Sequence, residues 1–267
     1  MAPEEDDRSL LIVGGGKMGE AILAGLLAAG RDAGALAVAE VAAARREQLA
    51  EAYPGVTVAD APMPAAGALL AVKPADVASA ARAVAEAGAR RIVSVAAGVT
   101  TAAIEAAAGR PLPVVRAMPN TPALVGAGVS AISPGASAGE ADLAWAEDLL
   151  GAVGVVVRVP EQALDAVTGL SGSGPAYVLL VAEAMAEAGV LAGLSRDVAE
   201  TLAFQTLLGS ATLLLESGDS PAALRAAVTS PGGTTAAGLR ALERHGVRAA
   251  FLEAVMAAAE RSRELGA

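Results

Sequence analysis

The sequence predicts an α/β fold in which a domain built on a parallel sheet is followed by a domain of helices alone. In the first 160 residues, short apolar runs alternate with helix-like segments, which is typical of parallel strands joined by helices. After Pro160 the strand-like runs cease. We therefore expect two domains, residues 1–160 and residues 161–267.

The strands of the first domain are expected to be short, apolar and buried. We place them at residues 9–14, 36–40, around Val56, 69–72, 92–96 and from Val114, with two edge strands at 128–132 and 155–159. The helices between them are expected at residues 21–29, 41–52, 75–87, 101–108 and 139–150.

The second domain is predicted to be helical at residues 174–188, 196–216, 234–244 and 247–265, with another helix starting at Ser220-Pro221. These helices are apolar well beyond one stripe, which is typical of helices buried against a partner subunit. A large monomeric core is the alternative, and the small size of the domain argues against it. We expect a homodimer or a higher homo-oligomer.

Composition indicates a protein that does not span a membrane. Apolar residues make up 54% of the chain, but much of this is alanine, and the longest uncharged stretch, residues 117–139, contains three prolines. The acidic residues 1–7 lack the basic and apolar parts of a secretory signal. We expect a cytoplasmic protein.

Several kinds of site are excluded by residue counts. The chain has no cysteine and a single histidine, His245, so thiolate and multi-histidine metal sites are ruled out and no metal is expected. A net charge of −10 and an aromatic content of 2% argue against nucleic acid as a partner.

A glycine-rich loop follows the first strand and precedes the first helix. Its pattern is Gly-x-Gly-x-x-Gly, and its residues are Gly14, Gly16, Lys17, Met18 and Gly19. The first glycine permits a tight turn, the second lets backbone approach a pyrophosphate, and the third lets helix and sheet pack closely. In this context the pattern predicts a Rossmann-type dinucleotide-binding domain.

Two features near the second strand point to different dinucleotides. Glu40 ends that strand, where an acidic residue often holds a ribose 2′-hydroxyl, which favours NAD. Arg45 and Arg46 follow in the next helix and are placed to reach a 2′-phosphate instead, which favours NADP. A role as ordinary solvated residues is the alternative for all three.

Three further loops follow strands at the same predicted edge of the sheet, where parallel sheets bind ligands. They contain Ala71, Val72, Lys73 and Pro74; Ala96, Ala97 and Gly98; and Asn120. Lys17 and Lys73 are the only lysines of the chain, and both lie in these expected cofactor loops. The small residues leave room for a flat ring, and Asn120 offers an amide.

Two loops of the helical half complete the set. Residues 171–177, Ser-Gly-Ser-Gly-Pro-Ala-Tyr, are expected to form a flexible loop that runs into a helix. Residues 229–235 are rich in hydroxyls and glycine at a helix start, which favours a carboxylate site over plain helix capping.

Together these strings resemble the pyrroline-5-carboxylate reductase family. Gly-Gly-Gly-Lys-Met-Gly-Glu-Ala, Ala-Val-Lys-Pro, Ala-Ala-Gly-Val-Thr, Arg-Ala-Met-Pro-Asn-Thr-Pro-Ala, Ser-Gly-Ser-Gly-Pro-Ala-Tyr and Val-Thr-Ser-Pro-Gly-Gly-Thr-Thr occur in that family's order. They span residues 14–235, and the last string, continued through Ala-Ala-Gly-Leu-Arg-Ala-Leu-Glu, resembles the family signature.

The resemblance implies reduction of 1-pyrroline-5-carboxylate to L-proline, with NADP or possibly NAD as the cofactor. It implies a Rossmann domain, a helical dimerisation domain, and an active site that joins the cofactor domain of one subunit to the helical domain of another. By this resemblance Thr235 would hydrogen-bond the imine nitrogen, and Ser230, Gly232, Gly233 and Thr234 would hold the substrate carboxylate. Asn120, whose amide lies in a strand-end loop, is expected to bind the substrate as well.

Two alternatives remain. A β-hydroxyacid dehydrogenase shares the glycine-rich loop but uses a lysine in its helical half, and this chain has no lysine after Lys73. A non-catalytic dinucleotide-binding protein would not need ligand-type loops in both halves.

Overall fold

The computed structural model describes residues 9–266 and divides into two compact units. The sheet unit comprises Met1–Ser173 together with Ala257–Ala267, and the helical unit comprises Gly174–Met256. Residues 1–7, on which the expectation of no secretory signal rests, lie outside the described residues. The division at residues 160 and 161 stays a prediction about functional domains.

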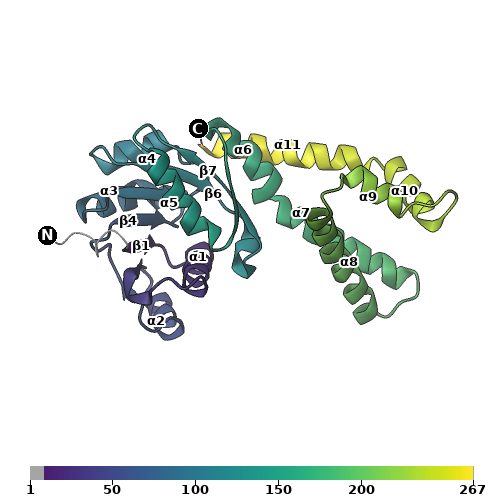
Figure 1. The fold of residues 1–267 in the computed structure, drawn as a ribbon, viewed down its shortest axis with the longest axis horizontal. Coiled ribbons are helices and arrows are strands. Elements are labelled where there is room, and N and C mark those ends of the chain that lie inside the picture. The colour runs from purple at the N-terminus through teal and green to yellow at the C-terminus, as the bar shows by residue number, and fades with distance from the viewer. Residues whose placement is uncertain (1–8, 267) are drawn as a thin grey trace. The chain divides into compact units, whose positions relative to one another are not determined.

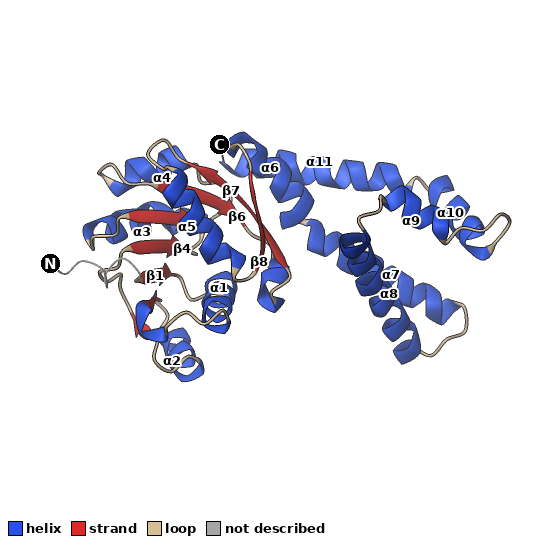
Figure 2. Cartoon of the chain, in the orientation of Figure 1, coloured by secondary structure: helices blue, strands red, loops and turns tan. Residues whose placement is uncertain are grey.

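The sheet unit is built on one eight-stranded sheet in the order β3-β2-β1-β4-β5-β6-β7-β8 (Figure 2). The strands are β1 (Leu10–Val13), β2 (Leu36–Ala39), β3 (Thr57–Ala59), β4 (Gly67–Leu70), β5 (Arg91–Ser94), β6 (Val114–Met118), β7 (Gly128–Pro134) and β8 (Gly154–Arg158). Each of the first six lies close to a strand expected from the sequence.

Helices cover both faces of this sheet (Figure 1). They are α1 (Lys17–Ala28), α2 (Ala43–Ala52), α3 (Val77–Glu86), α4 (Thr101–Ala108) and α5 (Glu140–Gly151). Leu10 and Ile12 of β1 belong to the core shared with α1, α2 and α5, whereas Leu11 and Val13 belong to the core shared with α3 and α4. This period of two is the reason why the strands are apolar throughout.

The register brings the carboxyl ends of four strands to one edge. Val13 pairs with Ala39 on one side and with Leu70 on the other, and Leu70 pairs with Ser94. The loops that follow β1, β2, β4 and β5 therefore begin side by side.

The far end of the sheet differs from the expectation. β7 runs antiparallel to β6 and pairs in parallel with β8, so of the two strands expected at an edge, β7 is an inner strand and β8 is an edge strand. The nine residues between β6 and β7, which include the single turn η4 (Thr121–Val125), are too few for a parallel crossover.

The helical half contains α6 (Leu164–Val167), α7 (Gly174–Leu191), α8 (Arg196–Ser217), α9 (Pro221–Ala227), α10 (Thr234–Arg244) and α11 (Val247–Gly266). Ser220 caps α9, as predicted, by accepting a hydrogen bond from the Ala223 amide at 3.2 Å.

Within the helical unit the two longest helices bury little. The buried residues of α7 and α8 are four alanines, Ala182, Ala186, Ala199 and Ala203, whereas side chains such as Leu179 and Leu208 are 64% and 61% exposed. The alternative of a large monomeric core is therefore wrong for the part of the chain that the structure describes.

The segment expected to be a flexible loop before α7 is helical. Thr168–Gly172 forms a π-helical turn, η6, that continues directly from α6. The hydroxyl of Thr168 donates to the Leu164 carbonyl at 2.8 Å, and that of Ser171 donates to the Val167 carbonyl at 3.1 Å. These side-chain hydrogen bonds occupy carbonyls of α6 next to the wider π-helical turn. The glycines of this segment by themselves do not predict such a turn.

Candidate active site

The glycine-rich loop occupies the carboxyl end of β1 and has the geometry that a dinucleotide requires. Gly14 has φ +101°, and a Cβ there would lie 2.6 Å from the Ala71 carbonyl oxygen. A Cβ on Gly19 would lie 2.1 Å from the Gly14 oxygen, whereas a Cβ on Gly16 would meet nothing within 4 Å. The first and third glycines thus permit close packing, and the second faces open space.

The same loop leads into the N-terminus of α1. Gly16 is the N-cap residue, and among the described residues no side chain caps this helix. Lys17 is exposed, and Met18 packs against the core. An uncapped helix N-terminus beside an open glycine is suited to bind a pyrophosphate, so these residues fit the expected cofactor.

Glu40 and the two arginines are engaged with the chain itself. Glu40 accepts hydrogen bonds from the amides of Gly15 and Ala42, both at 2.8 Å. Arg45 donates to the Gly15 carbonyl at 2.7 Å and forms an ion pair with Glu20. Arg46 donates to the carbonyls of Glu40 and Val41, both at 2.9 Å.

Glu20 also accepts a hydrogen bond from the Tyr53 hydroxyl at 3.3 Å. Burial raises the pKa of Tyr53, and the adjacent Glu20 carboxylate raises it further. Tyr53 therefore remains a neutral donor, which helps to hold Glu20 in place beside Arg45.

Two further predicted loops line one cavity of the sheet unit. The loop Ala71–Pro74 follows β4, and the loop Ala96–Gly98 follows β5. A cavity of about 340 Å³ is lined by Pro74, Ala97, Gly98, Thr168, Ser173, Ala258, Arg261, Ser262 and Leu265. The lining from the end of α11 was not expected, because nothing in the sequence links that segment to Gly98.

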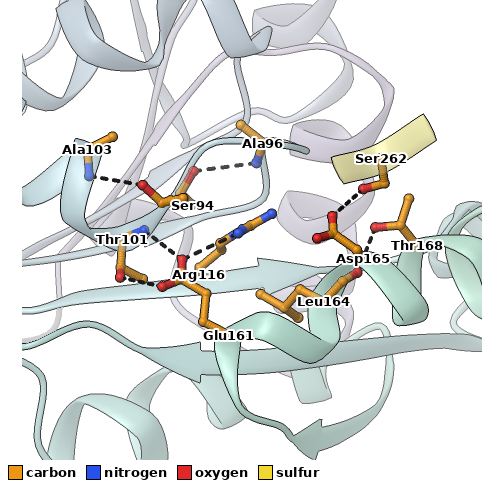
Figure 3. A network of polar contacts seen from close by, with 11 residues as sticks. Ser94, Ala96, Thr101, Ala103, Arg116, Glu161, Leu164, Asp165, Thr168 and Ser262 are labelled. Atoms are coloured by element: carbon orange, nitrogen blue, oxygen red, sulfur yellow. Dashed lines mark hydrogen bonds and ion pairs between the residues drawn. The ribbon is translucent and has the colours of Figure 1, made fainter. Parts of the chain in front are cut away.

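A polar network fixes the elements around this cavity (Figure 3). Glu161 accepts hydrogen bonds from the backbone and hydroxyl of Thr101 and from Arg116. Ser262 of α11 donates to Asp165 at 2.6 Å. The sequence analysis missed Glu161, Asp165 and Ser262, because each partner is distant along the chain.

Asn120 is placed differently from the expectation of a substrate amide. It is 8% exposed, and its side-chain oxygen accepts the Val129 amide at 2.9 Å. This bond ties the turn after β6 to β7. The remaining donor of the side chain is its amide nitrogen, so a substrate role for Asn120 stays a prediction that rests on that group alone.

The loop before α10 carries the remaining predicted residues. The N-cap is Gly233, and within the described chain no side-chain hydrogen bond caps α10, although Ser230, Thr234 and Thr235 are all nearby in sequence. Gly232 has φ +71°, and a Cβ on Gly233 would lie 2.3 Å from the Ser230 hydroxyl. Plain helix capping therefore does not account for the hydroxyls of this loop.

The structure thus gathers the predicted cofactor residues on one sheet edge, while Ser230–Thr235 belong to the helical unit. Within residues 9–266, no group of three or more acidic or histidine side chains is arranged to hold a metal ion.

Comparison with known proteins settles the family. Residues 161–265 match the family model described as pyrroline-5-carboxylate reductase dimerisation, and residues 9–98 match NADP oxidoreductase coenzyme F420-dependent. The chain is 47% identical over 283 residues to a pyrroline-5-carboxylate reductase of Mycobacterium tuberculosis, with 96% of each chain covered. The chain belongs to the pyrroline-5-carboxylate reductase family.

Other relatives agree with this assignment. A pyrroline-5-carboxylate reductase of Synechocystis is 49% identical, covering 96% of this chain and 97% of the relative. The solved structure of the Coxiella burnetii reductase superposes with a TM-score of 0.91 at 35% identity, covering 98% and 99%. That of Plasmodium falciparum, solved with NADP bound, superposes with a TM-score of 0.84 at 27% identity, covering 98% and 99%.

Membership of the pyrroline-5-carboxylate reductase family confirms several predictions made from the sequence. They are the N-terminal parallel-sheet domain with a helical dimerisation domain, the oxidoreductase activity in proline biosynthesis, and an NADP-binding domain. The dimerisation model also makes the chain a homo-oligomer.

Proposed function

We propose that the carboxyl edge of the sheet holds the dinucleotide and that the loop before α10 holds 1-pyrroline-5-carboxylate. The uncapped loop at Gly233 is the observation that carries this proposal. No side chain of this loop caps α10. The hydroxyls of the loop and the amides at the start of the helix are suited to donate hydrogen bonds to the single carboxylate of the substrate.

The cofactor lies along the strand ends in this proposal. Gly14, Gly16 and Gly19 admit the pyrophosphate to the N-terminus of α1, with Lys17 and Met18 beside it. Pro74 of the loop after β4, and Ala97 and Gly98 of the loop after β5, line the cavity next to the reacting ring. The bound dinucleotide supplies the hydride.

The residues of the substrate loop orient the substrate and do not act as strong acids. Ser230, Gly232, Gly233 and Thr234 bind the carboxylate, and the Thr235 hydroxyl accepts a hydrogen bond from the protonated imine nitrogen. The substrate arrives protonated or gains its proton through water. Most of the rate acceleration then comes from holding the two rings close together.

The homo-oligomer is proposed to be at least a homodimer formed through the helical unit. Leu179 of α7 and Leu208 of α8 belong to a large aliphatic surface that a single chain leaves exposed. Burial of such a surface against a symmetry mate gives an obligate interface. By the family resemblance, the substrate loop of one subunit then forms an active site together with the cofactor domain of another subunit.

The same apolar surface must be considered in assigning the protein to the cytoplasm or to a membrane. Two helical segments, Glu161–Leu191 and Arg196–Ser217, are long and apolar enough to cross a membrane. Both lie inside the matched dimerisation region, so a partner subunit accounts for their apolar faces. We therefore assign the protein to the cytoplasm, without a membrane or nucleic acid as partner.

One assay tests the reaction, and one tests the shared site. Oxidation of NADPH and NADH is followed with pyrroline-5-carboxylate, with piperideine carboxylates and with 3-hydroxy acids. Activity confined to 3-hydroxy acids would favour the hydroxyacid dehydrogenase alternative. Mixing Gly16→Val chains, whose open glycine is blocked, with Thr235→Ala chains should raise the activity above that of Thr235→Ala chains alone. Mixed oligomers no more active than Thr235→Ala chains would contradict sites shared between subunits.

A further inference from the structure

We infer that Ser262 is a positioning residue for hydride transfer and acts through its hydrogen bond to Asp165. The bond anchors the end of α11, which packs on the loop Ala96–Gly98 beside the cavity of the sheet unit. The inference rests on the proposed placement of the reacting ring next to that cavity. All of the residues concerned belong to the sheet unit.

The last turn of α11 packs on Gly98 through backbone atoms. Gly98 has φ +77°, and a Cβ there would lie 3.4 Å from the Leu265 carbonyl oxygen. A Cβ on Gly266 would lie 2.8 Å from the Gly98 carbonyl oxygen, closer than real side chains come. The helix end therefore forms a wall of the loop, and a displacement of the helix end removes support from the loop.

Ser262 fixes this helix end. The buried residues of α11 are Ala259 and Ser262, and Ser262 is 7% exposed. Its hydroxyl donates to the Asp165 carboxylate of α6 at 2.6 Å (Figure 3). A hydrogen bond to a carboxylate is shorter and stronger than one between neutral groups, so this single contact ties α11 firmly to α6.

The segment that carries Asp165 is itself anchored next to the loop. Glu161, which lies in the same segment, accepts hydrogen bonds from the backbone nitrogen and the hydroxyl of Thr101 at 2.7 and 2.9 Å. Leu164, between the two acidic residues, is 1% exposed. One short segment thus holds the chain just after Gly98 through Glu161, and holds the helix that packs on Gly98 through Asp165.

The loop acts on the ring by its position. Ala97 and Gly98 present only backbone atoms and one methyl group to the cavity, so no side-chain donor of this loop can orient a ligand there. Ser262 lines the same cavity, but its one hydroxyl proton is donated to Asp165. Ser262 therefore influences the ring through the loop that it supports. A misplacement of about 1 Å far from the reacting atoms can cost on the order of a hundredfold in rate.

The test compares the parent with Ser262→Ala, Asp165→Ala, Asp165→Asn and the double alanine variant. Ser9→Ala is the control, because its hydroxyl also bonds a distant residue, accepting the Ala66 amide at 2.8 Å. Ser9 precedes β1 and so lies at the amino end of the strands, opposite the cofactor edge. The measurements are kcat and KM for pyrroline-5-carboxylate with NADPH, the isotope effect on kcat with NADPH deuterated at the transferred position, and the thermal midpoint.

Ser262→Ala and Asp165→Ala should each lower kcat by about ten- to a hundred-fold and raise the isotope effect, because hydride transfer becomes the slow step. KM for pyrroline-5-carboxylate should hardly change. The double variant should be no slower than either single variant, since all three lose the same bond. Asp165→Asn keeps an acceptor oxygen and should retain most of kcat. Ser9→Ala should lower the thermal midpoint and leave kcat and the isotope effect at the parent values.

The inference is overturned by a Ser262→Ala variant with the kcat and isotope effect of the parent, or by an Asp165→Asn variant as slow as Asp165→Ala. Hydrogen exchange of the parent checks the placement of the ring separately. NADP⁺ should slow exchange of the amides of Ala96–Gly98. Absence of this protection would contradict the proposed placement, whereas protection together with an unchanged kcat in Ser262→Ala would contradict the positioning role alone.

Discussion

Glu161 accepts two hydrogen bonds from Thr101, one from the backbone nitrogen at 2.7 Å and one from the hydroxyl at 2.9 Å. Sixty residues separate the two along the chain. The same carboxylate pairs with Arg116 of β6 (Figure 3). Glu161, which follows β8 in the chain, therefore joins the start of α4 to strand β6. The loop Ala96–Gly98, which precedes α4, therefore depends on a residue outside the predicted cofactor motifs.

Replacement of Glu161 by alanine should lower the free energy of unfolding by about 2–3 kcal/mol. The side chains of Arg116 and Glu161 are only 10% and 25% exposed, so the arginine would keep a buried charge without its partner. Urea denaturation measures the loss. Glu264→Gln removes an exposed pair with Arg261 and should cost less than about 1 kcal/mol. Equal losses for the two variants would contradict a special role for Glu161.

Two glycines of the cofactor loop should respond differently to alanine. Gly16→Ala places a methyl group in open space, so the thermal midpoint should stay near that of the parent while dinucleotide affinity falls at least about tenfold. Gly14→Ala meets the Ala71 carbonyl at a positive φ, so it should lower the thermal midpoint itself. Gly151→Ala is the matched control for the first change, since it also meets nothing within 4 Å. Unchanged dinucleotide affinity in Gly16→Ala would place the pyrophosphate elsewhere.

Thr235→Ala should reduce kcat/KM for pyrroline-5-carboxylate by about ten- to a hundred-fold, because one hydrogen bond to a charged group is worth roughly 1.5–3 kcal/mol. Cofactor affinity and the thermal midpoint should hardly change. Turnover should persist, since the proximity of the rings remains. Thr212→Ala on α8 removes a threonine hydroxyl outside the loop and serves as the control. An unchanged kcat/KM would remove Thr235 from the substrate site.

Arg158 should make a pH-dependent contribution to stability. Its hydrogen bonds hold the pKa of Glu140 and of Glu147 below their usual range. A lowered carboxyl pKa gives stability that is present above the unfolded pKa of about 4.3 and is lost as pH falls through the lower folded value. The gap in thermal midpoint between the parent and Arg158→Met should therefore be largest near neutral pH and shrink by pH 3. A gap that is constant over this range would show that the ion pairs contribute nothing.

Charge placed on the helical surface should prevent assembly. Leu179→Glu and Leu208→Glu each put a carboxylate on side chains that are more than half exposed in the single chain. If these side chains lie in the subunit interface, burial of the charge costs more than the interface gains there. Light scattering should report smaller particles with little activity, while Val155→Glu on β8 of the sheet unit, where the apolar side chain is 66% exposed, is the control. An active, stable monomer would contradict both the interface and the shared site.

Local patterns in the sequence determined the elements with clear boundaries. The helices at 101–108 and 234–244 were predicted with the limits that the structure has. Thr100 and Gly233 are the N-cap residues of these helices, so each helix begins at the next residue. The glycine-rich loop, the alternation of strands and helices, and the apolar excess of the helical half likewise follow from neighbouring residues, and so does the family.

Tertiary structure decided what depends on partners distant in sequence. It alone gave the antiparallel β7, the π-helical turn at Thr168–Gly172, the bond from Asn120 to β7, and the α11 residues beside Gly98. It also decided that Arg45 pairs with Glu20 while Glu40 holds the amide of Gly15. Composition showed that these charges were present, but which of them meet is set by the register of β1 with β2 and the packing of α2, because the partners of these two pairs lie 25 residues apart and only folding brings them together.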